Sequence, residues 1–157
     1  MALKPASLDH VNIYVRSVER SCQWYRDTLG LEETDFIDRP NLRIAFLAAD
    51  RERAHEIALM EIGDDAAGTQ VGQVGLNHFA WKMESLDDLK AMYRRLKERG
   101  IATDHVSDHG VAVGVYFHDP DGNGVEVYYE LPRSEWGQER PFSDKTNVGR
   151  FPGPWDS

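Results

Sequence analysis

Alternating hydrophobic and polar positions near the start of the chain predict a β-strand over residues 8–15. The spacing then changes, and residues 18–29 follow a helical pattern that Gly30 ends. Three further strand-like runs cover residues 32–37, 41–48 and 56–62. The first half of the chain therefore predicts the order strand, helix, strand, strand, strand.

The same order recurs in the second half. Residues 75–83 alternate like a strand, and Ser85 is placed to cap a helix with Asp88 three residues later. An apolar helical face follows and ends at Gly100, and strand-like runs cover residues 103–106, 111–118 and 124–131. Each half has one histidine early in its first strand, so His10 and His78 are counterparts in an internal repeat.

This repeat predicts an α+β fold, with two tandem βαβββ modules forming a curved mixed sheet around a metal-binding cavity. We expect one domain over residues 1–157, with modules at about 6–63 and 72–132. Half a chain of this size is marginal on its own, so the modules are expected to share a core. The tail, residues 133–157, contains large aromatic side chains and is expected to pack on its own body or on a neighbouring subunit. These aromatic residues are Trp136, Phe142, Phe151 and Trp155.

Composition narrows the possible functions. The net charge of −9 argues against binding to nucleic acid, which requires a basic face. The sequence has neither an apolar run long enough to cross a bilayer nor the layout of a signal peptide, so we expect a cytoplasmic protein without a membrane partner. Cys22 is the only cysteine, which excludes an internal disulfide, and it is expected to be a small buried packing residue.

Three side chains form a candidate metal site. Alternation places His10 and His78 on one face of their strands, and Glu126 on one face of the last strand. Two imidazoles and one carboxylate suit Fe(II) or Mn(II) and leave about three coordination positions open. A lone histidine in a strand is more often a hydrogen-bonded core residue, and Glu126 could belong to the polar face of an edge strand. The matching histidines favour the metal site.

Three segments of the sequence resemble landmarks of the vicinal oxygen chelate superfamily. These are residues 9–11 (DHV), 24–31 (WYRDTLGL) and 119–123 (DPDGN), and the similarity covers residues 8–131. The superfamily includes glyoxalases, bleomycin- and fosfomycin-resistance proteins and extradiol ring-cleavage dioxygenases. These landmarks indicate the superfamily and leave the reaction open.

A second pattern is more specific. His109, five intervening residues, Val115 and Tyr116 are followed by the 119–123 segment and then by Glu126. This pattern resembles the signature of single-domain type I extradiol dioxygenases of the catechol 2,3-dioxygenase kind. The resemblance implies that His109 and Tyr116 line the substrate pocket and hydrogen-bond a substrate hydroxyl or an oxygen intermediate. Ser107 departs from the usual pattern in a minor way.

The resemblance also assigns roles to residues outside that signature. His55 would be the acid/base near bound oxygen, since imidazole exchanges protons near neutral pH. Asn12 would line the pocket, and Tyr128 faces the same way as Glu126 by alternation. A surface position at a strand edge is an equally good reading of His55, and core packing is the alternative for Tyr128. His105 and His118 receive no role.

The resemblance implies O2-dependent ring cleavage of a catechol-type aromatic diol at a mononuclear Fe(II) site, with Mn(II) as the alternative. The partners would be a small aromatic diol and O2, and we expect a homo-oligomer. Arg43 or Arg150 could offer a countercharge to a carboxylated catechol.

Two other functions compete on the same scaffold. A glyoxalase or isomerase would need a fourth ligand from the last strand of the first half, where sequence pairing places Ile57 opposite Glu126. A one-residue slip would place Glu56 there instead. An antibiotic-sequestering protein is the second rival, and such proteins often lack a complete ligand set.

Overall fold

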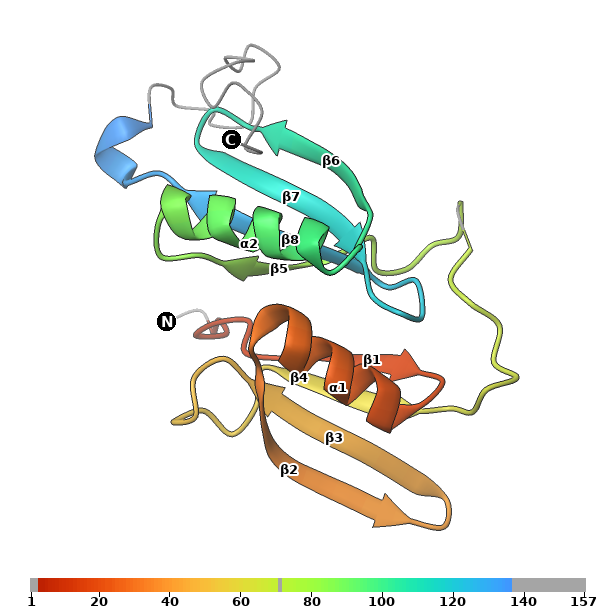
Figure 1. Cartoon of the computed structure of the whole chain (residues 1–157). Coiled ribbons are helices and arrows are strands. Elements are labelled where there is room, and N and C mark those ends of the chain that lie inside the picture. The colour runs from red at the N-terminus through yellow and green to blue at the C-terminus, as the bar shows by residue number, and fades with distance from the viewer. Residues whose placement is uncertain (1–2, 71, 137–157) are drawn as a thin grey trace. The chain divides into compact units, whose positions relative to one another are not determined.

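The computed structural model describes residues 3–70 and 72–136. The chain divides into two compact units, residues 1–70 and 71–157, which are treated separately below. The elements of the first unit follow the order expected from the sequence (Figure 1). They are β1 (Val11–Val15), α1 (Val18–Leu29), β2 (Glu32–Arg39), β3 (Leu42–Ala48) and β4 (Ile57–Glu61).

The second unit repeats this order and adds a short 3-10 helix. Its elements are β5 (Phe79–Lys82), α2 (Leu86–Glu98), β6 (Thr103–Asp108), β7 (Ala112–His118), β8 (Gly124–Glu130) and η1 (Arg133–Glu135). Each unit forms a four-stranded mixed sheet, with orders β1-β4-β3-β2 and β5-β8-β7-β6. The first strand of each sheet pairs in parallel with the last, and the other pairs are antiparallel. The two predicted βαβββ modules are confirmed. That they enclose a common cavity stays a prediction.

Both helices begin and end where the sequence predicts. The Ser17 side chain accepts a hydrogen bond from the backbone N–H of Arg20, and Gly30 ends α1 in the left-handed conformation, with φ of 76°. In α2, Ser85 Oγ accepts from the backbone N–H of Asp88 at 3.1 Å. The two serines satisfy backbone N–H groups that have no partner within the helix, and the Gly30 N–H donates to the Arg26 carbonyl at the other end of α1.

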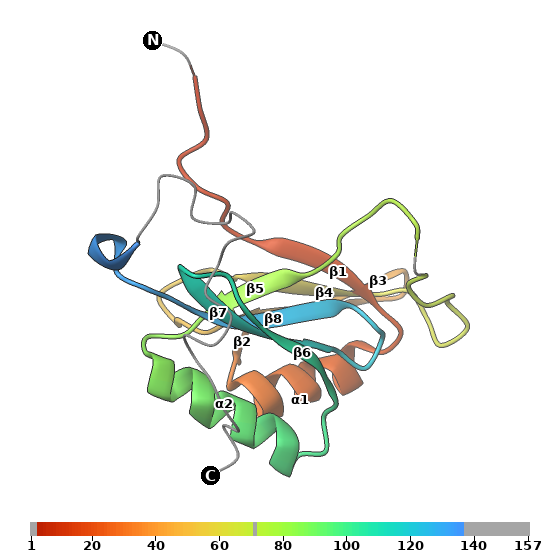
Figure 2. The same cartoon turned by 90° about the horizontal axis from the view of Figure 1, so that it is seen from above.

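Each helix covers one face of its own sheet, as the view from above shows (Figure 2). In β1, Ile13 and Val15 are buried, whereas Tyr14, between them, is 62% exposed. In β8, Val125 and Val127 are fully buried on either side of Glu126. Because side chains alternate along a strand, one face of each sheet is apolar and the other carries the polar candidates.

Cys22 lies on the buried side of α1, as expected for a packing residue. Its thiol donates a hydrogen bond to Glu33 Oε2 at 3.1 Å. Burial, reinforced by the Glu33 carboxylate, raises the pKa of the Cys22 thiol to about 12. The thiol is therefore protonated at neutral pH and is unsuited to nucleophilic chemistry.

The turn between β7 and β8 is built around a buried aspartate. Asp119 Oδ1 accepts hydrogen bonds from the backbone N–H groups of Asp121 and Asn123, at 2.9 and 2.8 Å. Gly122 adopts φ of 88°, which glycine tolerates best. This turn holds the two strands in register, so that Tyr116 pairs directly with Glu126.

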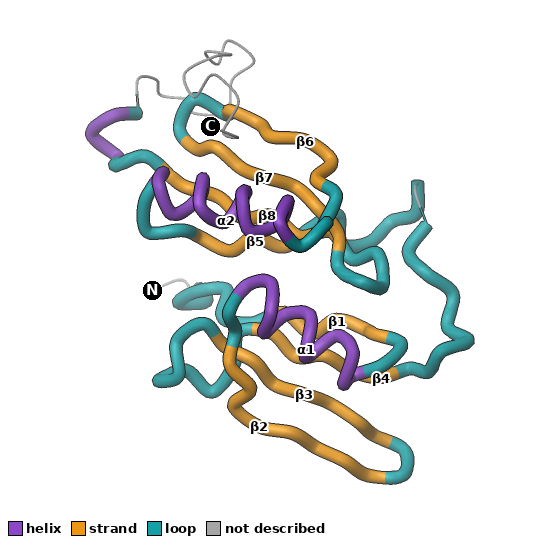
Figure 3. Tube along the Cα trace, viewed as in Figure 1, coloured by secondary structure: helices purple, strands orange, loops and turns teal. Residues whose placement is uncertain are grey.

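Three further observations complete the fold. Among the helices in the described part of the chain, none has the length and apolarity needed to cross a membrane. The described residues between β4 and β5, on either side of position 71, form no helix or strand, as Figure 3 shows. After β8, Trp136 Nε1 donates to the Leu131 carbonyl at 2.8 Å, and the Arg133 guanidinium lies over the Trp136 ring. The other three aromatic residues of the tail lie outside the described residues.

Candidate metal centre and its surroundings

Two of the three predicted metal ligands contact each other within the second unit. His78 Nε2 lies 3.2 Å from Glu126 Oε2. His78 directly precedes β5, and β5 pairs in parallel with β8, which carries Glu126. The Glu126 side chain is 11% exposed, so its carboxylate is largely withdrawn from water and needs polar partners.

Asn77 orients the His78 ring. Asn77 Oδ1 lies 2.6 Å from His78 Nδ1, and an amide oxygen can only accept a hydrogen bond. His78 Nδ1 therefore carries a proton, which leaves Nε2 as the ring nitrogen that faces Glu126. A metal-ligating histidine is usually held in this way by a hydrogen bond to its second nitrogen.

A glycine allows this segment to approach β8. A Cβ atom at Gly124 would lie 2.2 Å from the backbone oxygen of Asn77 and 3.2 Å from His78 Cβ. A backbone atom cannot move aside as a side chain can, so a residue with a side chain at position 124 would displace the segment that bears His78.

Tyr116 and His109 surround the same carboxylate. Tyr116 hydrogen-bonds Glu126, and its hydroxyl oxygen lies 3.1 Å from His109 Nε2. Burial and the Glu126 carboxylate together raise the pKa of Tyr116 well above its ordinary value. The phenol has one proton, which it donates to Glu126, so His109 Nε2 donates to the phenol oxygen. Glu126 is thus contacted by His78 and by Tyr116, and His109 contacts Tyr116.

His105 joins this cluster although the sequence assigned it no role. Its ring stacks on Tyr116, with centroids 4.4 Å apart and an interplanar angle of 11°. The register of β6 against β7 shifts between Thr103 and His105, and His105 then pairs with Tyr116. A β-bulge changes the direction in which the following side chains point. The alternation of residues along β6 therefore does not predict the contact between His105 and Tyr116.

In the first unit, His10 and His55 lie together. Their ring centroids are 4.4 Å apart, and Phe46 contacts His55 edge-on at 5.1 Å. His10 directly precedes β1, as His78 directly precedes β5. His55 is partly buried just before β4 and packs against the first candidate ligand, so its catalytic role stays a prediction that this contact favours.

The remaining pocket candidates lie on the expected faces. Asn12 is exposed on β1, and Tyr128 is half-buried on β8, two residues after Glu126. Burial raises the pKa of Tyr128, and the Glu130 carboxylate adds to that effect. His118, which received no role, is exposed and lies 3.1 Å from Asp104.

The registers of the two sheets identify the first-unit counterpart of Glu126. The second residue after His10 pairs with Ala58, and the second residue after His78 pairs with Glu126. Ala58 is therefore the equivalent of Glu126, one position away from the Ile57 that sequence pairing indicated. The sequence comparison aligned the strand ends, whereas hydrogen bonding to β1 sets the actual register.

Glu56, the other candidate for a fourth ligand, has partners of its own. Its Oε2 accepts a hydrogen bond from the Ala49 backbone N–H at 2.8 Å, and its Oε1 lies 3.6 Å from the Arg53 guanidinium. A slip of one residue would not bring Glu56 to the Ala58 position, which is two residues away. The first unit thus has an alanine where a four-ligand site needs a carboxylate.

Arg43, a possible countercharge for a substrate, is already surrounded by carboxylates. It forms ion pairs with Glu19, with Glu61 at 3.0 Å and with Asp38 at 3.2 Å. The Arg43 guanidinium holds the pKa of Glu19 below its ordinary value. Arg43 therefore joins α1, β2, β3 and β4, and this argues against a role in substrate binding. Arg150 lies outside the described residues.

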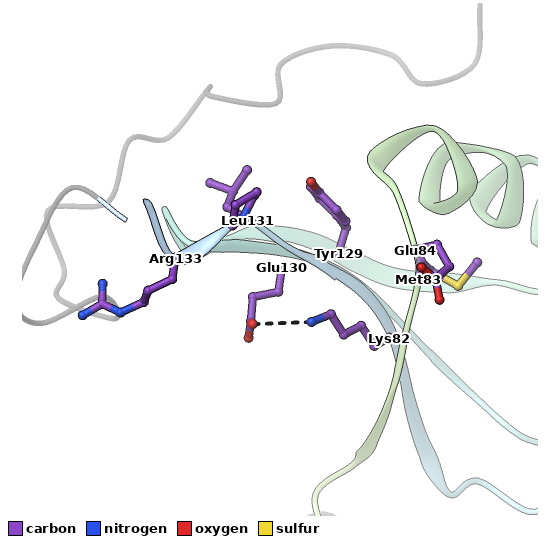
Figure 4. Close-up of a pocket in the computed structure, with 8 residues that line it drawn as sticks. Lys82, Met83, Glu84, Tyr129, Glu130, Leu131 and Arg133 are labelled. Carbon is purple, nitrogen blue, oxygen red and sulfur yellow. Dashed lines mark ion pairs between the residues drawn. The ribbon is translucent and has the colours of Figure 1, made fainter. Parts of the chain in front are cut away.

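An open pocket of about 590 Å³ lies at the ends of β5 and β8. Its charges include two basic and two acidic side chains, and Lys82 Nζ lies 3.5 Å from Glu130 Oε1 (Figure 4). None of the candidate site residues lines it. The residues that do are Lys82, Met83, Glu84, Tyr129, Glu130, Leu131, Pro132 and Arg133.

The His78–Glu126 pair fits a metal ion. Metal–ligand bonds of roughly 2.1 Å place two neighbouring ligands of an octahedral ion about 3.0 Å apart. The observed separation of 3.2 Å is close to that value, and the donor types suit Fe(II) and Mn(II). Among the described residues, no three His, Cys, Asp or Glu side chains gather as ligands for one ion. His10 as the third ligand stays a prediction.

Comparison with known proteins gives several relatives. The chain is 36% identical over 134 residues to the catechol-2,3-dioxygenase of Bacillus subtilis (strain 168), covering 85% of this chain and 45% of the relative. It is 33% identical over 121 residues to biphenyl-2,3-diol 1,2-dioxygenase 3 of Rhodococcus globerulus, covering 76% and 61%. The chain thus spans about half the length of these relatives.

Other relatives differ in activity or in metal. A trivalent organoarsenical cleaving enzyme of Bacillus sp. (strain MD1) is 26% identical, with 84% of this chain and 78% of the relative covered. A manganese-dependent 2,3-dihydroxybiphenyl 1,2-dioxygenase of Geobacillus genomosp. 3 is 25% identical, with 96% and 45% covered. The range of names means that the fold alone does not define the reaction.

Solved structures share the fold. A glyoxylase/bleomycin resistance protein/dioxygenase domain from Frankia sp. EAN1pec superposes with a TM-score of 0.67 at 24% identity, covering 82% of this chain and 99% of that one. The model of the Glyoxalase/Bleomycin resistance protein/Dioxygenase superfamily matches residues 7–127. The chain therefore belongs to this superfamily.

Proposed function

We propose that this protein is an extradiol dioxygenase that cleaves the ring of a catechol-type aromatic diol with O2, using Fe(II), with Mn(II) as the alternative. One observation carries the proposal. The Glu126 carboxylate contacts a candidate ligand, His78, and also Tyr116, which contacts His109; the extradiol pattern assigns Tyr116 and His109 to the substrate pocket. The two relatives named for cleavage of catechol and biphenyl-2,3-diol support the choice of substrate class.

In this proposal the metal ligands are His10, His78 and Glu126. When bound, the ion would hold the two substrate oxygens and couple oxidation of the ring to reduction of O2. Asn77 keeps the proton of His78 on Nδ1 and so presents the Nε2 lone pair. The first unit supports a role for His10 only through its position, which matches that of His78.

Tyr116 and His109 would hold charged oxygen atoms of the substrate in place. With a metal ion on Glu126, the hydrogen bonds that these groups donate to Glu126 and to the phenol oxygen would turn to the substrate, and positioned donors stabilise developing negative charge. The high pKa of Tyr116 keeps its hydroxyl protonated throughout the neutral range, so the phenol acts as a donor there. Tyr128 and Asn12 would complete the pocket wall.

His55 would be the acid/base that delivers a proton to a substrate oxygen. An imidazole gains and loses protons near neutral pH, which suits transfer to an oxygen atom during ring opening. The contact between His55 and His10 supports this assignment, because it places a proton-transfer group beside a candidate ligand.

The four-ligand glyoxalase or isomerase is the less favoured reading. Ala58 occupies the first-unit position equivalent to Glu126, and Glu56 is engaged with Ala49 and Arg53. Three protein ligands leave room for both a chelating diol and O2, whereas four would not.

The test is metal analysis of anaerobically purified protein together with a panel of catechols. We expect one Fe(II) or Mn(II) per chain, and a yellow ring-opened product that forms only with O2. Glu126→Ala should lose both metal and turnover, whereas Glu98→Ala, at the exposed end of α2, should retain both. Absence of product across the panel with iron-loaded protein would refute the proposal.

The same experiment separates the rivals. Nickel or zinc in the purified protein, with turnover that depends on glutathione, would favour the glyoxalase. Unchanged ligand affinity in Glu126→Ala would favour sequestration. We also propose that the protein is a homo-oligomer. Light scattering coupled to size-exclusion chromatography measures its molar mass and checks this directly.

A further inference from the structure

Gly114 lies in the middle of β7, where a glycine is unusual. Glycine weakens a strand interior, because it has no side chain to pack and loses more conformational freedom on folding. Its backbone does not require glycine, since Gly114 is not among the described glycines with positive φ. A glycine in such a position often marks the close approach of another group.

The approaching group is the Glu126 carboxylate. A Cβ atom at position 114 would lie 2.1 Å from Glu126 Oε1, 3.0 Å from Glu126 Cδ and 3.2 Å from Tyr116 Cε2. Real Cβ atoms essentially never approach another heavy atom within 3.0 Å, so the 2.1 Å distance to Oε1 excludes a side chain while the carboxylate stays in place. The carboxylate therefore occupies the space that any side chain at position 114 would need.

The first unit shows the opposite arrangement at the same place. Ile44 in β3 pairs with Met60, two residues after Ala58. Gly114 in β7 pairs with Tyr128, two residues after Glu126, so Ile44 and Gly114 are equivalent. Where the last strand has a small alanine, its neighbour has a large isoleucine. Where the last strand has glutamate, its neighbour has glycine. The two side-chain volumes change together, as close packing on a shared face requires.

We propose that Gly114 is a positioning residue that holds the Glu126 carboxylate against His78, an inference that rests on the proposed function. The carboxylate lies between the open face of Gly114 and the hydroxyl of Tyr116, and its Oε2 points at His78 Nε2. A methyl group at position 114 would turn it away from His78.

Gly114→Ala tests this with Mn(II) as the probe. The dissociation constant is measured by electron paramagnetic resonance of free Mn(II), without turnover. We expect it to rise at least tenfold in Gly114→Ala. The urea midpoint should change little, since the far end of a flexible side chain can move aside. Gly75→Ala is the matched control, because nothing lies within 4 Å of its Cβ position and its φ is not positive.

A second background separates positioning from general distortion of the sheet. Glu126→Asp shortens the side chain by one methylene and withdraws the carboxylate from position 114. The Mn(II) dissociation constant of the double variant should therefore be less than twofold higher than that of Glu126→Asp alone. An equal loss in both backgrounds, or an unchanged constant in Gly114→Ala alone, overturns the inference.

A readout on metal-free protein distinguishes this inference from the proposed function. Loss of the contact between Glu126 and His78 should shift the ¹⁵N resonance of His78 Nε2 in Gly114→Ala at fixed pH. Wild-type protein that binds no Mn(II) or Fe(II) refutes the proposed function, whereas an unshifted resonance refutes the role of Gly114.

Discussion

His78 Nε2 and Glu126 Oε2 lie 3.2 Å apart although the residues are 48 positions apart in the sequence. Parallel pairing of β5 with β8 produces this contact, because the second residue after His78 pairs with Glu126 itself. Gly124 permits the close approach of the segment before β5, and the turn around Asp119 sets the register of β8 against β7. Strand pairing and the close packing of the segment before β5 together produce this contact.

Asn77→Ala should weaken metal binding. The substitution removes the oxygen that accepts from His78 Nδ1 at 2.6 Å, so the ring loses its fixed orientation and tautomer. Loss of such a partner typically costs about 10- to 100-fold in metal affinity. Titration with Mn(II) measures the change. Asn41→Ala, at the exposed turn between β2 and β3, is the control, and equal affinities in the two variants would contradict the role of Asn77.

Tyr116→Phe should slow turnover while the metal remains bound. The variant keeps the ring that stacks on His105 and removes the hydroxyl that links His109 to Glu126. Loss of a positioned donor typically lowers kcat by about 10²-fold. Steady-state kinetics with catechol measures it. Tyr93→Phe, on α2, should leave kcat unchanged, and full activity of Tyr116→Phe would exclude the hydroxyl from the reaction.

Cys22 should resist alkylation in the folded protein. Burial and Glu33 raise the pKa of the thiol to about 12, and since ionisation requires a pH near that value, almost no thiolate exists at pH 8. Labelling with iodoacetamide at pH 8 should be at least about 100-fold slower in native protein than in urea. Mass spectrometry follows the reaction. In Glu33→Gln the pKa should fall and labelling should accelerate, and rapid labelling of native wild type would contradict the assignment.

Arg43→Ala should destabilise the first unit at neutral pH and leave the KM for a carboxylated catechol unchanged. Arg43 lowers the pKa of Glu19, so this contribution to stability is present above the unfolded pKa of roughly 4.3 and is lost as pH falls below it. The difference in urea midpoint between wild type and variant should therefore shrink between about pH 5 and pH 3. A raised KM would instead assign Arg43 to the substrate.

Much of the fold follows from local sequence. Serines before both helices and Gly30 after the first mark helix ends, because capping depends on neighbouring residues alone. The repeat of hydrophobic periodicity predicted both modules. One histidine near the start of each module made His10 and His78 counterparts and candidate metal ligands. The extradiol pattern selected His109 and Tyr116 as pocket residues, and the structure brings them within 3.1 Å of each other, while their role toward a substrate stays a prediction.

Tertiary structure decided what depends on pairing between strands. The bulge before His105 placed it on Tyr116, and the register of β1 against β4 made Ala58, not Ile57, the counterpart of Glu126. A sequence records which side chains alternate along one strand, but the register between strands results from hydrogen bonds between distant segments. For the same reason, the space that Gly114 leaves for a carboxylate twelve residues away became visible only in three dimensions.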